Sequence, residues 1–411
     1  MSSHGTMLKT VAGLGLAACV ATGCSSPASR MRLVEASLHE PPVMDASHLL
    51  DVSGERLRLA DRMAVHKVPG LSVTVVSDSR IDWSSSYGVR DAVSGAPVRS
   101  DTLFEIASTS KLVTAVLAMR LVEQGILSLD APVNDQLKSW QIPANELTRQ
   151  RPVTLRMLLS HTAGINRPQS MYAIEEGSSP TLLDVLDGRR PAINDPVTVG
   201  SLPGSRHRYS NIGYDVIQLL IEETTGKPFA EVMRTEIFEP LEMASCTYEF
   251  PFSAATLERV ARPHDAQMKP WMNDLHPSAL AHGGLLCTSG DLAKLAVELI
   301  RVYQGASDRI LSRHTLEQML VSQQDPEDEI GGFNGQGLGV FLLEDGQTLY
   351  FAHHGYSIPG TCCLLIVNPS RGDAAAIMAN GADGFALICE VTAAVADVYR
   401  WPAVRPGVPG A

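Results

Sequence analysis

The pattern of apolar and polar residues predicts strands near both ends of the chain and helices between them. Leu71–Val89 holds two β-rich runs around a polar turn, which is typical of a hairpin. Gly337–Gly355 and Cys362–Gly381 predict two more hairpins, and an amphipathic helix over about Gly384–Trp401 follows them. The economical assembly is one antiparallel sheet that both ends of the chain build.

The middle of the chain alternates helical patterns with loops. Its most apolar pattern runs from Ser108 to about Gln124 and stops at Gly125, a residue typical of helix C-termini. Apolar residues lie nearly all around this helix, which predicts burial on most sides. We therefore expect an α/β (α+β) fold. A sheet subdomain over about 46–110 and 335–400 would be flanked by helices, beside a mostly helical subdomain over about 111–334.

The first 24 residues are typical of a leader for export. Lys9 precedes the apolar stretch Val11–Cys24, which is far too short to span a membrane. Small residues precede both Cys19 and Cys24, so each resembles a lipoprotein cleavage box, and we favour Cys24, which leaves the longer hydrophobic core. Residues 25–45 are interpreted as a linker that begins with a flexible tether, and residues 46–400 as the folded domain. We expect an exported protein, periplasmic or anchored to a membrane by a lipid.

Charge and cysteine spacing argue against several other kinds of site. The formal net charge is -12 and the basic residues are scattered, which argues against nucleic acid as a partner. Five cysteines follow the leader, an odd number without a CxxC pair, which predicts buried free thiols rather than zinc ligands or disulfides. His353 and His354 are neighbours on a predicted strand and point to opposite faces. We expect no metal and no cofactor.

The motif STSK, at the start of the apolar helix, is the first candidate for a catalytic site. On a helix, Ser108 and Lys111 lie on one face with Cβ atoms about 5–6 Å apart, so a neutral lysine amine could accept the serine proton. The helix N-terminus would stabilise a developing oxyanion there. Ser110 points about 100° away from Lys111, so the spacing favours Ser108. A capped core helix would show the same letters, because serine is a common N-cap.

Two further segments favour catalysis over a capped core helix. Tyr209-Ser210-Asn211 opens another helical pattern, where a tyrosine hydroxyl could shuttle a proton and an asparagine could hold a substrate amide. His353-His354-Gly355 ends a predicted strand, with its first and last residues on one face. Its glycine would let a substrate approach the backbone closely. His161 and His282 are interpreted as structural residues that satisfy loop carbonyls.

With these three motifs, the chain resembles the β-lactamase-related serine hydrolases, or penicillin-recognising enzymes. This family includes class C β-lactamases, DD-peptidases and family VIII carboxylesterases, and its members carry SxxK and related motifs. Here the motifs read SxxK, YxN and HxG, and accessory segments such as LLSHTAGI and GGLLCTSGDLAKLA also look like the family. The resemblance covers about residues 50–400. It implies a β-lactamase/transpeptidase-like fold and a small-molecule ester, β-lactam or peptide substrate.

The resemblance also assigns roles to individual residues. It implies that Ser108 is the nucleophile, that Lys111 and Tyr209 are the acid/base pair, and that Asn211 positions the substrate. The backbone N–H groups of Ser108 and Tyr356 would form the oxyanion hole.

The third motif departs from the β-lactamase pattern. His353 stands where β-lactamases place a lysine, and a histidine is largely neutral at pH 7. A substrate carboxylate would therefore lose a permanent cation, which argues against efficient β-lactam turnover. We expect an enzyme that hydrolyses an ester or a D-amino-acid peptide amide. A family VIII-type carboxylesterase, a true class C β-lactamase and a non-turnover penicillin-binding or sensor protein remain as alternatives.

Overall fold

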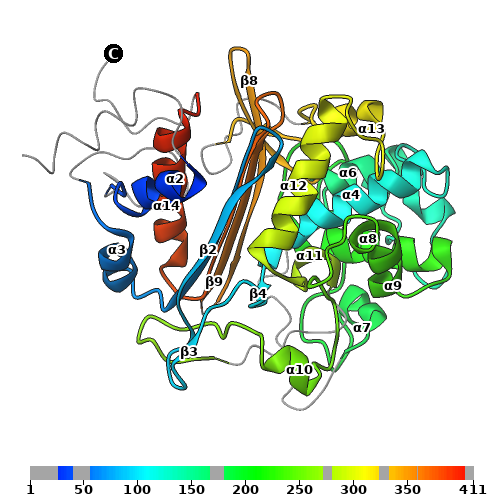
Figure 1. Ribbon diagram of the computed structural model, residues 1–411. Helices are drawn as coiled ribbons and strands as arrows, with labels where there is room; N and C mark the ends of the chain where they lie inside the picture. Colours follow the sequence, from blue (N-terminus) through cyan, green and yellow to red (C-terminus); the bar gives the residue numbers. More distant parts are fainter. Residues whose placement is uncertain are drawn as a thin grey trace, which may run out of the picture.

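A single antiparallel sheet separates two helical layers in the computed structural model (Figure 1). The structure describes residues 26–39, 56–166, 180–271, 280–323, 333–358 and 360–402. These residues form an eight-stranded sheet with the order β3-β2-β1-β10-β9-β8-β7-β6, and a separate two-stranded sheet of β4 and β5.

Both ends of the chain supply the large sheet, as the hydrophobic pattern predicts. The strands are β1 (Gly70–Ser77), β2 (Arg80–Asp91), β3 (Ala96–Pro97), β6 (Gly335–Gln336), β7 (Phe341–Asp345), β8 (Thr348–Ser357), β9 (Thr361–Asn368) and β10 (Asp373–Ala379). The two halves join where β1 pairs with β10, with Leu71 opposite Ala379. All three predicted hairpins are present, and the expected antiparallel sheet built from both chain ends is confirmed.

Helices cover both faces of the sheet. One face carries α2 (Pro27–Glu35), α3 (Leu59–Val65) and α14 (Gly384–Tyr399), drawn in blue and red in Figure 1. The other face carries α12 (Ser289–Tyr303), which packs on β1 and β10, and behind it the helical region. That region contains α4 (Ser110–Glu123), α5 (Glu146–Gln150), α6 (Leu155–Leu159), α7 (Leu182–Asp187), α8 (Asn211–Thr225), α9 (Phe229–Met233), α10 (Ala254–Leu257), α11 (Leu280–Gly283) and α13 (Arg313–Met319).

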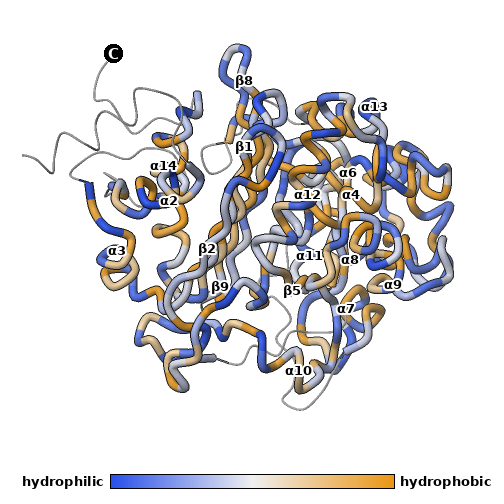
Figure 2. Tube along the Cα trace, viewed as in Figure 1, coloured by the Kyte–Doolittle hydropathy of each residue, from blue (hydrophilic) through white to orange (hydrophobic). Residues whose placement is uncertain are grey.

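The central strands are apolar on both faces because each face has its own core. In β9, Cys362 belongs to the core under α14, whereas its neighbour Cys363 belongs to the core under α12 and α4. Side chains alternate across a strand, so one continuous apolar run serves both layers. The hydropathy colouring shows these apolar strands between the two helical layers (Figure 2).

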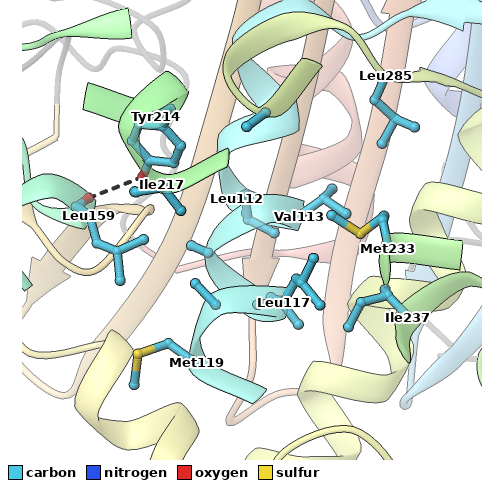
Figure 3. Packing of buried hydrophobic residues seen from close by; sticks show 14 of the residues in the cluster. Leu112, Val113, Leu117, Met119, Leu159, Tyr214, Ile217, Met233, Ile237 and Leu285 are labelled. Carbon is cyan, nitrogen blue, oxygen red and sulfur yellow. Dashed lines mark hydrogen bonds between the residues drawn. The ribbon is translucent and has the colours of Figure 1, made fainter. Parts of the chain in front are cut away.

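Helix α4 is buried on nearly every side, as its sequence predicts. Leu112, Val113, Leu117 and Met119 are at most 1% exposed and contact different neighbouring elements (Figure 3). Burial of apolar side chains stabilises a fold by about 25 cal/mol per Å², so this helix is held firmly in place. Residues at the N-terminus of α4 are therefore also held rigidly.

The segment expected to be a linker is partly a docked helix. Ser26 caps α2, and Pro27 occupies its first turn, the position where proline is best tolerated in a helix. Arg30 binds both carboxylate oxygens of Asp82 on β2, and Tyr399 at the end of α14 donates a hydrogen bond to the same carboxylate. The expected flexible tether over the start of residues 25–45 is therefore wrong, because this network attaches the segment to the sheet.

Two of the cysteines expected to be free form a disulfide. Cys246 and Cys287 are bonded across a sequence separation of 41 residues. A bridge between Thr247 and Leu286 brings the two segments together, and no spacing along the chain indicates it. Cys362, Cys363 and Cys389 are free, as expected. The bonded segment includes β5 (Leu286–Cys287), which pairs with β4 (Phe104–Glu105) just ahead of Ser108.

Candidate active site

Ser108 lies in a tight turn between β4 and α4. Residues Ala107–Thr109 form a single 3₁₀ turn, and the α-helix begins at Ser110 rather than at Ser108 as the sequence suggested. Ala107 has a φ of 44°, in the left-handed region that residues other than glycine rarely adopt. This strained residue is supported by its neighbour Ile106, whose N–H donates to the carbonyl of Leu285 at 3.0 Å. The turn therefore places the serine just before the N-terminus of a rigid helix.

Lys111 reaches Ser108 from inside the protein. Its Nζ lies 3.0 Å from Ser108 Oγ and 2.7 Å from the carbonyl oxygen of His282. The lysine side chain is fully buried, whereas Ser108 is partly exposed. The other candidate serine, Ser110, is buried, and its Oγ accepts the N–H of Leu285 at 3.3 Å. Of these two serines, Ser108 is the one that combines a partly exposed side chain with a lysine at hydrogen-bond distance.

Tyr209 and Asn211 lie at the start of α8, next to the lysine. The centroid of the Tyr209 ring is 5.0 Å from Lys111 Nζ, and Asn211 is the first residue of the helix. Ser210 caps α8 by accepting the N–H of Gly213 at 3.3 Å. The structure thus brings the first two sequence motifs together.

His161 holds the tyrosine turn, in a way the sequence did not indicate. Its Nδ1 accepts the N–H of Ser210 at 3.1 Å, and its ring lies 4.3 Å from the Tyr209 ring. Burial, and then the charge of Lys111, hold the pKa of His161 well below its usual value. Its structural role agrees with expectation, but its partners are a backbone N–H and a ring rather than a loop carbonyl.

Gly355 on β8 meets the nucleophile turn. A Cβ atom at this position would lie 2.1 Å from the carbonyl oxygen of Ile106 and 3.0 Å from the N of Ser108. The glycine therefore lets the strand dock against the turn; the sequence suggested that it makes room for a substrate. Tyr356 is the next residue on β8 and is 45% exposed. The two backbone segments expected to supply the oxyanion hole are adjacent.

His353 is buried and neutral. Its side chain is 1% exposed, its Nδ1–H donates to the carbonyl of His354 at 2.8 Å, and its ring lies 4.6 Å from Phe341. Burial, and then the charge of Lys111, hold its pKa well below the usual value. The ring of His354 meets Phe385 of α14 at 5.3 Å and also the Phe341 ring at 5.1 Å. Alternation along β8 predicted opposite faces, but both histidine rings pack on Phe341, and little of His353 is open to direct contact with a substrate.

The described residues do not form a metal site. The described part of the chain contains no group of three or more histidine, cysteine or acidic side chains that could hold a metal ion. A groove of about 1290 Å³ lies between α2, α3 and the end of β2, and no predicted site residue lines it. We therefore place the candidate active site at Ser108.

Comparison with known proteins identifies the family. The beta-lactamase family profile matches residues 57–399, most of the chain. The chain belongs to the beta-lactamase family. Its Ser108 and Lys111, described above, stand in the SxxK motif of this family.

Three proteins similar to this chain differ in their names and in how much of the chain they match. Esterase EstB from Burkholderia gladioli is 32% identical over 213 residues, which is 50% of this chain and 52% of that protein. Penicillin-binding protein 4 from Amycolatopsis lactamdurans is 29% identical over 329 residues, 77% of this chain and 82% of that protein. The D-amino acid amidase from Ochrobactrum anthropi SV3 in complex with D-phenylalanine superposes with a TM-score of 0.66 at 25% identity, covering 86% of this chain and 98% of that one. The match to EstB therefore spans about half the length of each protein.

Proposed function

We propose that this beta-lactamase-family chain hydrolyses esters or D-amino-acid amides through an acyl-enzyme on Ser108. The observation that carries the proposal is the 3.0 Å contact between the buried Lys111 Nζ and the partly exposed Ser108 Oγ. At this distance an amine can take the hydroxyl proton as the oxygen attacks a carbonyl carbon.

Each residue has a step in the proposed reaction. Lys111 accepts the proton of Ser108 while Oγ bonds to the substrate carbonyl carbon, and the N–H groups of Ser108 and Tyr356 stabilise the oxyanion. Tyr209 passes the proton to the leaving alcohol or amine, whose bond to the carbonyl carbon breaks. Water then attacks the acyl-enzyme and releases the acid, with the proton returned to Ser108. Asn211 would orient the substrate amide or ester.

The third motif favours a substrate whose binding does not need a positive charge from the enzyme. His353 is buried and neutral, so it supplies no permanent charge for a β-lactam or peptide carboxylate. EstB is named an esterase, and the Ochrobactrum anthropi enzyme is named a D-amino acid amidase. Both names agree with ester and amide substrates.

A parallel rate comparison tests the substrate class. We expect a short-chain p-nitrophenyl ester to be hydrolysed at least about 10²-fold faster than a chromogenic cephalosporin, with a D-Ala-D-Ala peptide between them, because no third-motif cation anchors a carboxylate. The measurement is kcat/KM on all three substrates at pH 7. Rapid cephalosporin hydrolysis that depends on Ser108 would contradict the argument from His353.

The same samples distinguish an enzyme from a sensor. Intact mass spectrometry after mixing with each compound should reveal a transient adduct on the hydrolase. An adduct that persists for hours, without product, would instead support the non-turnover penicillin-binding alternative.

We also propose that the chain works outside the cytoplasm, anchored at Cys24. The leader pattern and the Cys246–Cys287 disulfide support this, because disulfides persist in oxidising compartments. Cys19 and Cys24 lie outside the described residues, and no helix within the described residues is long and apolar enough to cross a bilayer.

Intact mass of the protein from the membrane fraction tests the anchor. We expect a mature chain that begins at Cys24 and carries a lipid mass, and we expect that mass to disappear in Cys24→Ala. A chain that keeps its leader and stays in the cytoplasmic fraction would contradict the proposal, and lipid retained in Cys24→Ala but lost in Cys19→Ala would move the anchor.

A further inference from the structure

Next to Lys111 lies a group of polar residues that is not part of the three motifs. The carbonyl oxygen of His282, on the short helix α11, accepts a hydrogen bond from Lys111 Nζ at 2.7 Å. That amine must also reach Ser108 Oγ, at 3.0 Å. The place of the carbonyl therefore helps to set the direction in which the amine points.

The side chain of His282 is held by a buried carboxylate. Its Nδ1 lies 2.8 Å from Oδ1 of Asp215, which is fully buried on α8, while His282 is 8% exposed. Asp215 is one helical turn beyond Asn211, so both lie on the same face of α8. The helix that carries the second motif thus also carries the partner of His282.

Other contacts fasten α11 between α8 and α4. Gln218, further along the same face of α8, accepts the N–H groups of Leu280 and Ala281 at 3.0 and 3.2 Å. From α4, Thr114 donates to the carbonyl of Ala281 at 2.8 Å. These bonds hold the first two residues of α11, and the His282–Asp215 contact holds the third, which lies next to Lys111.

The geometry points to His282 and Asp215 as a positioning pair for Lys111. Their hydrogen bond holds the His282 carbonyl where it receives one N–H of the amine, so that the amine is directed at Ser108 Oγ. The pair touches neither substrate nor reacting atoms and acts through the lysine. This inference rests on the proposed role of Lys111 as the base.

Alanine variants test the pair. We expect Asp215→Ala and His282→Ala to lower kcat on the p-nitrophenyl ester, and the rate at which a fluorophosphonate labels Ser108, by about 10- to 100-fold, because a small misplacement of a catalytic group is costly. KM should change by less than about threefold, because the pair does not contact substrate.

Amide variants separate positioning from bulk packing. Asparagine at position 282 offers an N–H as far from the backbone as Nδ1, so His282→Asn should restore kcat to within about fivefold of the original protein. His282→Gln places its N–H one atom farther out and should stay slow. Asp215→Asn keeps the acceptor oxygen and should also recover. If the alanine variants do not fold, the contrast between His282→Asn and His282→Gln decides the question.

His66→Ala is the matched control. His66, the residue after α3, makes the same kind of contact, with Nε2 2.7 Å from the buried Glu390 carboxylate on α14, but on the opposite face of the sheet. Loss of this contact in His66→Ala should lower the melting temperature and leave kcat unchanged.

The outcomes separate the two proposals. Unchanged kcat in the folded Asp215 and His282 variants, or equal rates for His282→Asn and His282→Gln, would overturn the positioning pair while Ser108 remained essential. Turnover that survives in Ser108→Ala would instead overturn the proposed function.

Discussion

Ser108→Ala is expected to lower kcat on the p-nitrophenyl ester by about 10⁴- to 10⁶-fold and to abolish labelling by a fluorophosphonate. Loss of a serine nucleophile in a catalytic unit of this type costs on that order, because the remaining groups have no oxygen to activate. The side chain is partly exposed, so its truncation should leave the melting temperature within about 2 °C. Steady-state rates, labelling and thermal unfolding measure the three quantities.

Ser110→Ala is the matched control for this experiment. Ser110 lies two residues away in the same motif, but it is buried and accepts the N–H of Leu285. Its loss leaves that N–H unpaired, which costs about 1–3 kcal/mol of folding free energy. We therefore expect Ser110→Ala to be less stable and still labelled. Labelling that survives in Ser108→Ala and disappears in Ser110→Ala would move the nucleophile to Ser110.

Gly355→Ala is expected to damage both stability and rate. The new Cβ atom would lie 2.1 Å from the carbonyl oxygen of Ile106 and 3.0 Å from the N of Ser108, both of them backbone atoms. Either β8 or the nucleophile turn must move, which costs about 1–3 kcal/mol of folding free energy. A shift of the serine of that order should lower kcat by about 10²-fold. Chemical denaturation and steady-state kinetics measure the two effects.

Gly200→Ala provides the comparison for the glycine experiment. No atom lies within 4 Å of a Cβ atom built at Gly200, and its backbone is outside the left-handed region. The free energy of unfolding and kcat should both stay close to their original values. If Gly355→Ala behaves in the same way as Gly200→Ala, the strand does not fix the nucleophile turn.

Local patterns in the sequence predicted much of the site. The three-residue spacing of Ser108 and Lys111 places them on one side of a helical turn whatever surrounds them, and the structure brings them to 3.0 Å. The apolar run after Lys111 correctly predicted a buried helix. These helical patterns repeat every three to four residues, so they can be read directly from the sequence.

Local periodicity was enough to predict the strands near both chain ends, the burial of α4 and the grouping of a serine with a lysine. The other contacts came from tertiary packing. It paired Cys246 with Cys287, placed Asp215 against His282 and set Gly355 against the turn at Ser108. Each of these contacts joins segments at least 41 residues apart, and only packing of the sheet against its helices brings such segments together.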